Sequence, residues 1–305
     1  MRPPPTQLDA IFARGLQVWR EHPEFVARFG DPGSLGYWSW LMGTQWPEDE
    51  DLQRLLPTPP HAFISRVSGA HSTARRFHES GLSDAQTFHE LFAAAGFDFS
   101  RKSALLDYGC GFGRVLRCLS RVADTTELHG ADVDADAVAW CRAHLTFAQF
   151  KTIPVRPPTP YPDAFFAGAY GFSVFTHLPE DLHLQWLAEL ARILRPGGIL
   201  ILTTHGQRCV DDFAAGKVPH FEFPSPAQMR QDLPELSRSG FGYYPYPASF
   251  NTSLPEADRD AGLHGMTYIL PHYVRTHWLR QFDLVRHAEA PKEWQDFVVL
   301  RRKSD

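Results

Sequence analysis

The chain has 305 residues, of which 43% are hydrophobic, and it carries a formal net charge of −5 at pH 7. This length accommodates one α/β domain with appendages and a sizeable core. The negative net charge argues against a standing attraction to nucleic acid, because phosphate neutralisation requires clustered lysine and arginine. Two short basic clusters, Arg75-Arg76 and Arg301-Arg302-Lys303, are interpreted as solvated surface.

The sequence carries no sign of a membrane or secreted protein. No window reaches the roughly 18 apolar residues of a membrane span, and the N-terminus has no apolar core segment. We therefore expect a cytoplasmic protein. The cysteines lack C-x-x-C spacing, which predicts reduced thiols at Cys110, Cys118, Cys141 and Cys209.

Residues 1–100 are predicted to form a helical extension, with helices joined by proline and glycine breaks. An aromatic cluster within it could line a pocket, join two copies in a homodimer, or build a small core. The small core is favoured, because large aromatic side chains are usually buried. The cluster comprises Tyr37, Trp38, Trp40 and Trp46.

A glycine-rich turn follows the first predicted buried strand. The run 105–114 reads Leu-Leu-Asp-Tyr-Gly-Cys-Gly-Phe-Gly-Arg, which is a strand ending in a carboxylate, then a turn, then a helix start. Because Gly109, Gly111 and Gly113 lack a Cβ, the backbone can adopt positive φ and a ligand can approach main-chain N–H groups. A dinucleotide fold requires G-x-G-x-x-G, whereas the third glycine here comes one residue early. The pattern indicates a nucleotide-binding turn of another kind.

This D-x-G-x-G-x-G pattern resembles the first motif of class I S-adenosylmethionine-dependent methyltransferases. The resemblance implies that S-adenosylmethionine is the cofactor, that S-adenosylhomocysteine is the product, and that the glycines at 109, 111 and 113 line the cofactor site. The carboxylate of Asp107 suits a zwitterionic cofactor, because it attracts an ammonium group and repels a pyrophosphate. The first helix is predicted over 112–122.

A second strand is predicted over 128–132 and ends in Asp132. The resemblance implies that Asp132 accepts hydrogen bonds from the ribose diol, with Val133 beside it in the cofactor site. A carboxylate at a strand end is also commonly a helix cap, and Asp134 or Asp136 could take that role for the following helix.

The middle of the chain continues in the order of the resembled family. After the proline-rich passage 154–162, the run 164–175 is predicted as a buried fourth strand, and Pro179 opens a helix with one apolar face. The sequence Arg-Pro-Gly-Gly at 195–198 ends that helix, and a buried strand follows over 199–204.

Two further residues are expected to contact the cofactor. Ligands of an open α/β sheet lie beyond the carboxyl ends of its strands, which places Tyr170 near the site. The residues do not specify the adenine contact, although the backbone at Ile153 or Pro154 could serve.

A helix within 268–281 and two closely spaced strands, 282–286 and 295–300, end the sheet. So short a connection requires antiparallel pairing, because a parallel return needs a crossover. The resembled fold ends with such a reversed strand. We therefore expect an α/β fold with a Rossmann-like seven-stranded sheet and an antiparallel last strand, in a methyltransferase domain over 101–305.

The segment 206–267 lies between the fifth strand and the last helix. A long segment without clear periodicity is usually functional or disordered, and its many aromatic residues argue against disorder. We interpret it as a lid insertion over the methyl acceptor. Its aromatic residues include Phe221, Phe223, Phe241, Tyr243, Tyr244, Tyr246 and Phe250.

The 15 histidines form no recognisable metal motif, and no metal is expected. Three histidines are instead candidates for the general base that would deprotonate a hydroxyl group. His177 and His205 follow the fourth and fifth strands, and His264 lies in the lid. His177 could alternatively serve only to buttress the start of the following helix.

The sequence thus predicts an S-adenosylmethionine-dependent methyltransferase acting on an oxygen of a small molecule, such as a glycan or a specialised metabolite. No nucleic acid or membrane partner is expected. N-methylation, or a protein or RNA acceptor, is the alternative among enzymes, although an RNA acceptor would favour basic clustering that is missing. A catalytically inactive S-adenosylmethionine-binding partner subunit is the alternative of another class.

Overall fold

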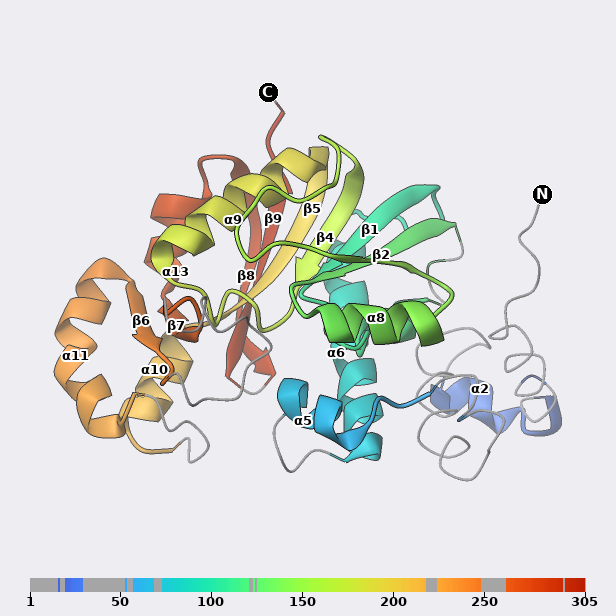
Figure 1. Ribbon diagram of the computed structural model, residues 1–305, viewed down its shortest axis with the longest axis horizontal. Helices are drawn as coiled ribbons and strands as arrows, with labels where there is room; N and C mark the ends of the chain where they lie inside the picture. The colour runs from blue at the N-terminus through green and yellow to red at the C-terminus, as the bar shows by residue number, and fades with distance from the viewer. Residues whose placement is uncertain are drawn as a thin grey trace. The chain divides into compact units, whose positions relative to one another are not determined.

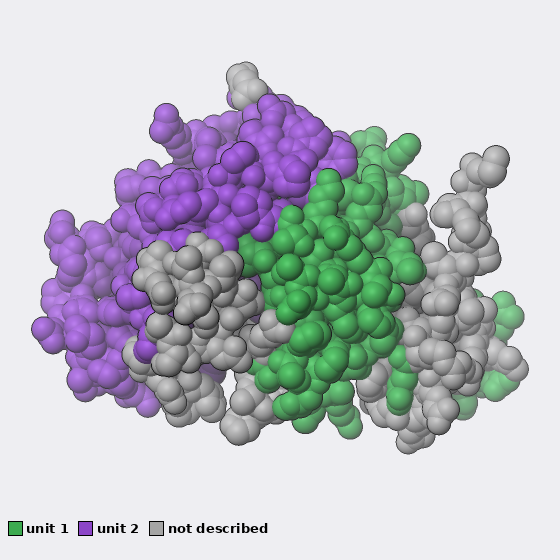
Figure 2. Space-filling view, in the orientation of Figure 1, with its two compact units in different colours: residues 1–152 green, residues 153–305 purple. Residues whose placement is uncertain are grey.

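The computed structural model describes residues 16, 20–29, 53, 57–68, 73–120, 123, 125–217, 224–247, 262–292 and 294–304. The chain divides into two compact units, residues 1–152 and 153–305, which Figure 2 colours separately. The predicted boundary between an extension and a domain at residues 100 and 101 stays a prediction. The predicted aromatic cluster at Tyr37, Trp38, Trp40 and Trp46 lies outside the described residues.

The first unit places helices around three parallel strands (Figure 1). Strand β2 pairs with both β1 and β3, and all three run in the same direction. The strands are β1 (Ser103–Tyr108), β2 (Thr126–Asp132) and β3 (Gln149–Thr152); the helices are α2 (Glu24–Phe29), α5 (His61–Ser68), α6 (Ala74–Ala94), α7 (Leu116–Leu119) and α8 (Ala135–His144). The described parts of residues 1–100 are thus mainly helical, as the sequence predicted.

The long helix α6 begins where the sequence offers a cap. The side chain of Thr73 accepts a hydrogen bond from the backbone N–H of Arg76, which satisfies one of the unpaired N–H groups of the first turn. One face of the helix buries Phe77, Phe88 and Phe92 completely. Burial of this aromatic face gives the helix most of its stabilisation.

Helix α7 is shorter than predicted. The sequence favoured a helix over 112–122, whereas among the described residues of that range only Leu116–Leu119 are helical. Gly113 adopts a φ of 69°, in the left-handed region, so a right-handed helix cannot begin before it. The glycine that shapes the turn therefore also delays the helix.

The second unit continues the same alternation of strand and helix. Strand β4 (Phe166–Gly171) pairs in parallel with β5 (Leu194–His205), and α9 (Glu180–Ile193) connects them. Strand β9 (Gln295–Arg302) runs antiparallel both to β5 and to β8 (Phe282–Lys292), which confirms the predicted reversed ending. Before β8 the chain forms the short helix α13 (Pro271–Tyr273) and the π-helical turn η3 (Val274–Trp278).

The expected fold class is confirmed, with one addition. Three strands of the first unit and β4, β5, β8 and β9 of the second make up the seven that were predicted for a Rossmann-like sheet. Among the described residues two further strands, β6 (Phe241–Pro245) and β7 (Gly265–Ile269), form an antiparallel hairpin. Strand β7 lies beside the end of β5 and pairs with it in parallel at one position, His205 with Tyr268.

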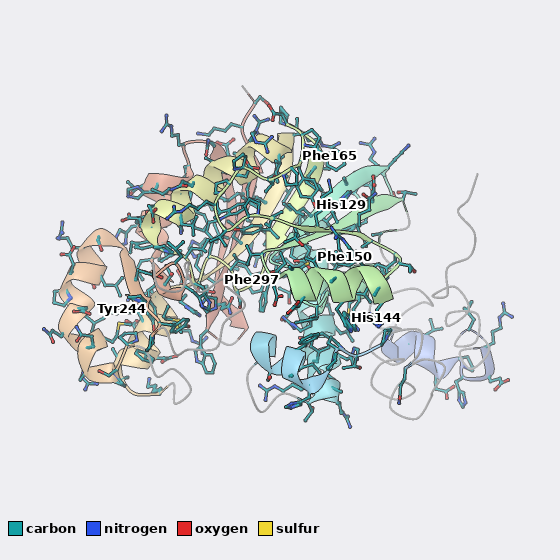
Figure 3. All side chains as sticks on the ribbon, viewed as in Figure 1. His129, His144, Phe150, Phe165, Tyr244 and Phe297 are labelled. Atoms are coloured by element: carbon teal, nitrogen blue, oxygen red, sulfur yellow. The ribbon has the colours of Figure 1, made fainter. Side chains whose placement is uncertain are left out.

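The hairpin belongs to the segment that we interpreted as a lid. This segment also contains helices α10 (Gln207–Ala214) and α11 (Pro226–Ser239), which lie beside the hairpin in Figure 1. The hydroxyl of Tyr244, labelled in Figure 3, donates to the carboxylate of Asp232 in α11 at 2.9 Å. The segment has a core that includes Cys209, Phe213, Met229, Leu236 and Met266, together with Tyr268 just beyond it in β7. Its described part is therefore folded rather than an irregular loop.

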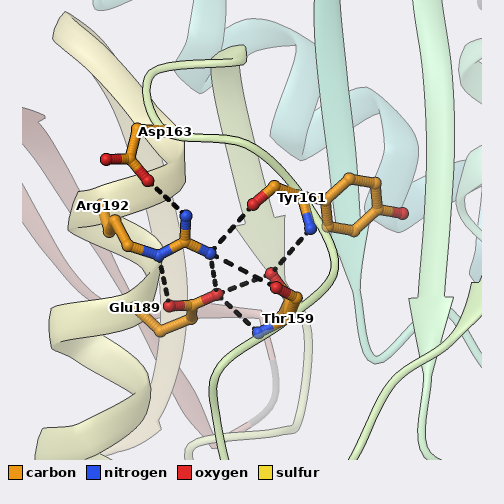
Figure 4. A network of polar contacts seen from close by, with 5 residues as sticks. All are labelled: Thr159, Tyr161, Asp163, Glu189 and Arg192. Atoms are coloured by element: carbon orange, nitrogen blue, oxygen red, sulfur yellow. Dashed lines mark hydrogen bonds and ion pairs between the residues drawn. The ribbon is translucent and has the colours of Figure 1, made fainter.

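A polar network fastens the proline-rich passage to α9 (Figure 4). The carboxylate of Glu189 accepts hydrogen bonds from the backbone N–H of Thr159 at 2.7 Å and from its hydroxyl at 2.6 Å. Arg192 donates to the same carboxylate at 2.8 Å and to the carbonyl of Tyr161 at 3.0 Å. The network fixes the chain that leads into β4.

Candidate functional site

The glycine-rich turn lies in the first unit, directly after β1. Gly109, Gly111 and Gly113 have φ values of 78°, 50° and 69°, so all three occupy the left-handed region. Any other residue would strain this backbone. The turn is tight, since a Cβ at Gly113 would lie 2.6 Å from the Cδ1 atom of Leu145. The predicted requirement for glycine is confirmed at each position.

The turn is fastened to the end of β2. The backbone N–H groups of Gly109 and Cys110 both donate to the carbonyl of Ala131, at 2.8 and 3.1 Å. Asp107, the penultimate residue of β1, is 3% exposed. The pKa of Cys110 is raised by burial and by the nearby carboxylates of Asp132 and Asp107. The turn thus lies between two acidic strand ends.

Asp132 takes part in holding the turn. One carboxylate oxygen accepts the N–H of Gly111 at 2.7 Å, and the other accepts the N–H of Asp134 at 2.9 Å. Burial raises the pKa of Asp132, and the N–H bonds from Asp134, Gly111 and Val133 oppose that rise. These three bonds leave one of the roughly four lone-pair sites of the carboxylate, so the geometry is compatible with one hydrogen bond from the ribose. That contact, and the place of Val133 beside it, stay predictions.

Helix capping falls to a neighbouring carboxylate. The side chain of Asp134 accepts the N–H groups of Asp136 and Ala137, at 3.0 and 3.1 Å, at the start of α8. The capping alternative that the sequence left open is therefore filled by Asp134. Asp132 instead accepts a hydrogen bond from the turn, at Gly111.

The predicted contacts Ile153 and Tyr170 belong to the second unit. Ile153 follows the last residue of β3 and is 4% exposed, and Tyr170 is fully buried in β4 opposite Ile201. Cofactor contact at both residues stays a prediction.

Two of the candidate bases lie against the same strand of the second unit. The Nδ1 atom of His177 lies 2.9 Å from the carbonyl oxygen of Gly265, and that of His205 lies 3.1 Å from the carbonyl oxygen of Thr267. A carbonyl only accepts hydrogen bonds, so each Nδ1 carries the hydrogen and each Nε2 keeps its lone pair. The sequence placed both histidines after strands but could not foresee that β7 orients them.

These imidazoles are neutral at physiological pH. Burial lowers the pKa of His177 below its usual 6.5, although the hydrogen bond to Gly265 opposes the shift. Burial lowers the pKa of His205 to about 3, and His177 adds to that effect. His205 is only 3% exposed, whereas His177 is half-buried. His177 is therefore the better placed of the two to meet a ligand.

Tyr246 was one of the aromatic residues predicted in the insertion, and the sequence indicated no role for it. Its hydroxyl lies 3.5 Å from the Nδ1 atom of His177. Its ring lies 5.0 Å from that of His264, which in turn lies 5.1 Å from the ring of His177. A tyrosine and a histidine 18 residues apart carry no local signal, because only the β6–β7 pairing brings them together.

The four cysteines are buried free thiols, as predicted. Across the described ranges no group of three or more histidine, cysteine, aspartate or glutamate side chains is arranged to hold a metal ion. No helix within those ranges has both the length and the apolar character to cross a membrane.

Comparison with known proteins identifies the domain. Residues 106–202 match the family model described as a methyltransferase domain. This part of the chain is therefore similar to a methyltransferase domain. The match begins at the end of β1 and ends within β5, so it covers the glycine turn and Asp132.

The curated relatives differ in what they methylate. The chain is 29% identical over 119 residues to a fatty-acid O-methyltransferase of Mycolicibacterium smegmatis, covering 39% of this chain and 42% of that protein. It is 27% identical over 218 residues to a ribosomal protein L11 methyltransferase of Bordetella bronchiseptica, covering 70% and 66%. The chain thus spans between two fifths and two thirds of these relatives.

Solved structures are similar at a distance. One is a SAM-dependent methyltransferase from Methanosarcina mazei, with 16% identity, a TM-score of 0.46, and coverage of 68% of this chain and 96% of that chain.

Proposed function

We propose that this protein transfers the methyl group of S-adenosylmethionine to a hydroxyl group of a small molecule. The observation that carries the proposal is the turn of three glycines with positive φ, fastened to Asp132 through Gly111 N–H at 2.7 Å. Such a turn admits a ligand to main-chain atoms, and two carboxylates flank it. The N-methyl, protein and RNA acceptors considered above are the alternatives for the acceptor.

Different residues of the proposed cofactor site bind different parts of the cofactor. Asp107 attracts the ammonium group of the cofactor, and Asp132 accepts a hydrogen bond from the ribose, with Val133 beside it. The remaining contacts are assigned to Gly109, Gly111, Gly113, Ile153 and Tyr170. When bound, the cofactor supplies an electrophilic methyl group on a positively charged sulfur.

The acceptor proton needs a destination, and His177 is the proposed general base. The acceptor oxygen forms its bond to the methyl carbon as the bond from sulfur to that carbon breaks. The electron pair stays on the sulfur of S-adenosylhomocysteine, and the proton passes to Nε2 of His177. The hydrogen bond from Nδ1 to Gly265 at 2.9 Å supports this role, because it fixes the tautomer with a basic Nε2. His205 is the second candidate.

Titration with S-adenosylhomocysteine tests the cofactor site. Gly111→Val places a β-branched side chain on a backbone with a φ of 50°, beside the proposed ligand. We expect its dissociation constant to rise at least tenfold. Gly96→Val is the matched control, because Gly96 has a φ of 83° and nothing within 4 Å of its Cβ position. Unchanged affinity in a folded Gly111→Val protein would refute the proposed site.

Transfer of a labelled methyl group separates the enzyme from an inactive partner subunit. The intact enzyme labels an acceptor, whereas a subunit that only binds the cofactor does not. Cytoplasmic location, the homodimer and the absence of a nucleic acid partner stay predictions.

A further inference from the structure

Three rings of the second unit form a cluster that the methyltransferase domain match does not include as a whole. His177 follows β4, Tyr246 follows β6, and His264 precedes β7. Their ring centroids are 5.0 to 6.0 Å apart, at interplanar angles of 45° to 71°. We call His177, Tyr246 and His264 the ring cluster. All three residues are half-buried.

The ring cluster is formed of neutral groups. Burial lowers the pKa of His264 to about 3, with His177 adding to the effect, and burial alone raises the pKa of Tyr246 to about 12. His177 is neutral for the reason given above. Among the described residues, no carboxylate shifts the pKa of any of the three rings. Near neutral pH the cluster therefore offers hydrogen bonds without formal charge.

Among the described residues, the buried Nδ1 atom of His264 in the ring cluster has no hydrogen-bond partner. A buried polar atom without a partner is costly, and such atoms in native proteins call for an explanation. A ligand hydroxyl suits this atom in either tautomer, because a hydroxyl both donates and accepts.

The same surroundings disfavour a charged ligand. A carboxylate, phosphate or ammonium group would lose water without gaining a counter-charge from the cluster. An aromatic ring, by contrast, packs favourably at the edge or face of other rings at centroid distances like those present here. Resting on the proposed function, we propose that the ring cluster binds an uncharged, hydroxylated aromatic compound as the methyl acceptor and discriminates against charged analogues.

Three probes of similar size test the preference for a neutral compound. 4-Ethylphenol is uncharged, 4-hydroxybenzoate carries a carboxylate, and tyramine carries an ammonium group. Each is titrated calorimetrically into the full-length protein saturated with S-adenosylhomocysteine. We expect 4-ethylphenol to bind at least tenfold more tightly than either charged probe.

A pair of isosteric variants tests whether His264 sets the preference. His264→Asn and His264→Asp have side chains of equal size that differ by one charge. We expect tyramine to bind at least tenfold more tightly to the Asp variant than to the Asn variant, and 4-hydroxybenzoate to bind more weakly. Tyr246→Phe, which removes only a hydroxyl, should weaken 4-ethylphenol binding and supplies a test if the His264 variants do not fold.

The outcomes separate this inference from the proposed function. Failure of the wild-type protein to bind S-adenosylhomocysteine refutes the proposed function. Normal S-adenosylhomocysteine binding with equal affinity for the three probes, with preference for a charged probe, or with no binding of any probe overturns the inference about the ring cluster alone.

Discussion

The carboxylate of Asp132 accepts the backbone N–H of Gly111 in the turn and the backbone N–H of Asp134, so its removal should weaken ligand binding. Hydrogen bonds to a charged group are worth about 1.5–3 kcal/mol each. We expect Asp132→Ala to raise the dissociation constant of S-adenosylhomocysteine at least tenfold in a calorimetric titration. Asp136→Ala, an exposed change in the first turn of α8, is the control. A dissociation constant within twofold of wild type would leave Asp132 without a role in the site.

The proposed base makes a second prediction at the scale of one residue. His177→Gln should lower kcat by roughly 10²–10⁴ while the affinity for S-adenosylhomocysteine stays near wild type. The exposed His61→Gln is the control. If His177→Gln and His205→Gln each keep more than a tenth of the wild-type kcat, neither histidine is the base, and the proton goes to His264 or to solvent.

The pH profile of the wild-type enzyme gives an independent test of the same base. Only the unprotonated imidazole accepts a proton, so activity falls as pH drops through its pKa. Burial lowers that pKa, and the groups that face His177 are the neutral Tyr246, His264 and His205. The acid limb should therefore lie below pH 6.5, and His177→Gln should abolish it.

Elements with strong local signals were predicted well. The buried parallel strands are marked by apolar runs in the sequence. The turn is marked by glycines, which a backbone with positive φ favours. Helix α11 was missed although its cap was present in the sequence: Ser225 caps its N-terminus, Pro226 opens it, and Gly240 ends it with a φ of 77°. Its periodicity was hidden, because among its residues only Met229 and Leu236 are buried.

Pairings between distant segments could not be predicted. No residue near His177 or His205 indicates that β7, some 60 to 90 residues later, supplies their hydrogen-bond acceptors. Likewise Asp132 could be recognised as a strand-end carboxylate, but its bond to Gly111 depends on how β1 and β2 align. The residues of the site were thus predictable by type and position, and their partners were not.

At the start of the insertion, the backbone at Gly206 lies very close to the side chain of Asp296 in β9. Gly206 follows β5, and a Cβ there would lie 1.9 Å from a carboxylate oxygen of Asp296 in β9. That carboxylate is fully buried and already accepts hydrogen bonds from His287 at 2.8 Å and from the N–H of Ala290 at 2.9 Å. These two hydrogen bonds oppose its displacement.

Gly206→Ala should therefore destabilise the protein, by about 1–3 kcal/mol as is typical of overpacking. Urea unfolding measures the change. A double-mutant cycle supplies the control, because Asp296→Ser removes the obstructing carboxylate and should reduce the effect of the added methyl group. Equal destabilisation by Gly206→Ala in both backgrounds would show that the contact with Asp296 is not the cause.

At the scale of the whole molecule, buried neutral histidines tie stability to pH. Burial lowers the pKa of His78 to about 2 and those of His183, His205 and His264 to about 3. Unfolding restores each to about 6.5, so between these values the unfolded chain binds more protons than the folded one. Their contribution is fully present above pH 6.5 and is lost as pH falls toward 3.

The resulting acid sensitivity should be steep. Well below pH 6.5 each such histidine loses about 1.4 kcal/mol per pH unit. Between pH 6.5 and 5.5, where the unfolded imidazole is still titrating, each loses about 1 kcal/mol and four together lose about 4 kcal/mol. That loss is a large fraction of the stability of a typical domain. We expect the thermal midpoint to fall sharply over this interval, as followed by circular dichroism.

His183 provides the sharpest check on this account. Its ring is fully buried among Phe175, Phe241, Tyr273 and Trp278, and neither ring nitrogen has a hydrogen-bond partner among the described residues. A phenylalanine suits such surroundings and cannot be protonated. His183→Phe should therefore reduce the slope of stability against pH by up to about 1.4 kcal/mol per pH unit, and the exposed His61→Phe is the matched control. An unaltered slope in His183→Phe would mean that this histidine is already protonated, or already neutral, in both states.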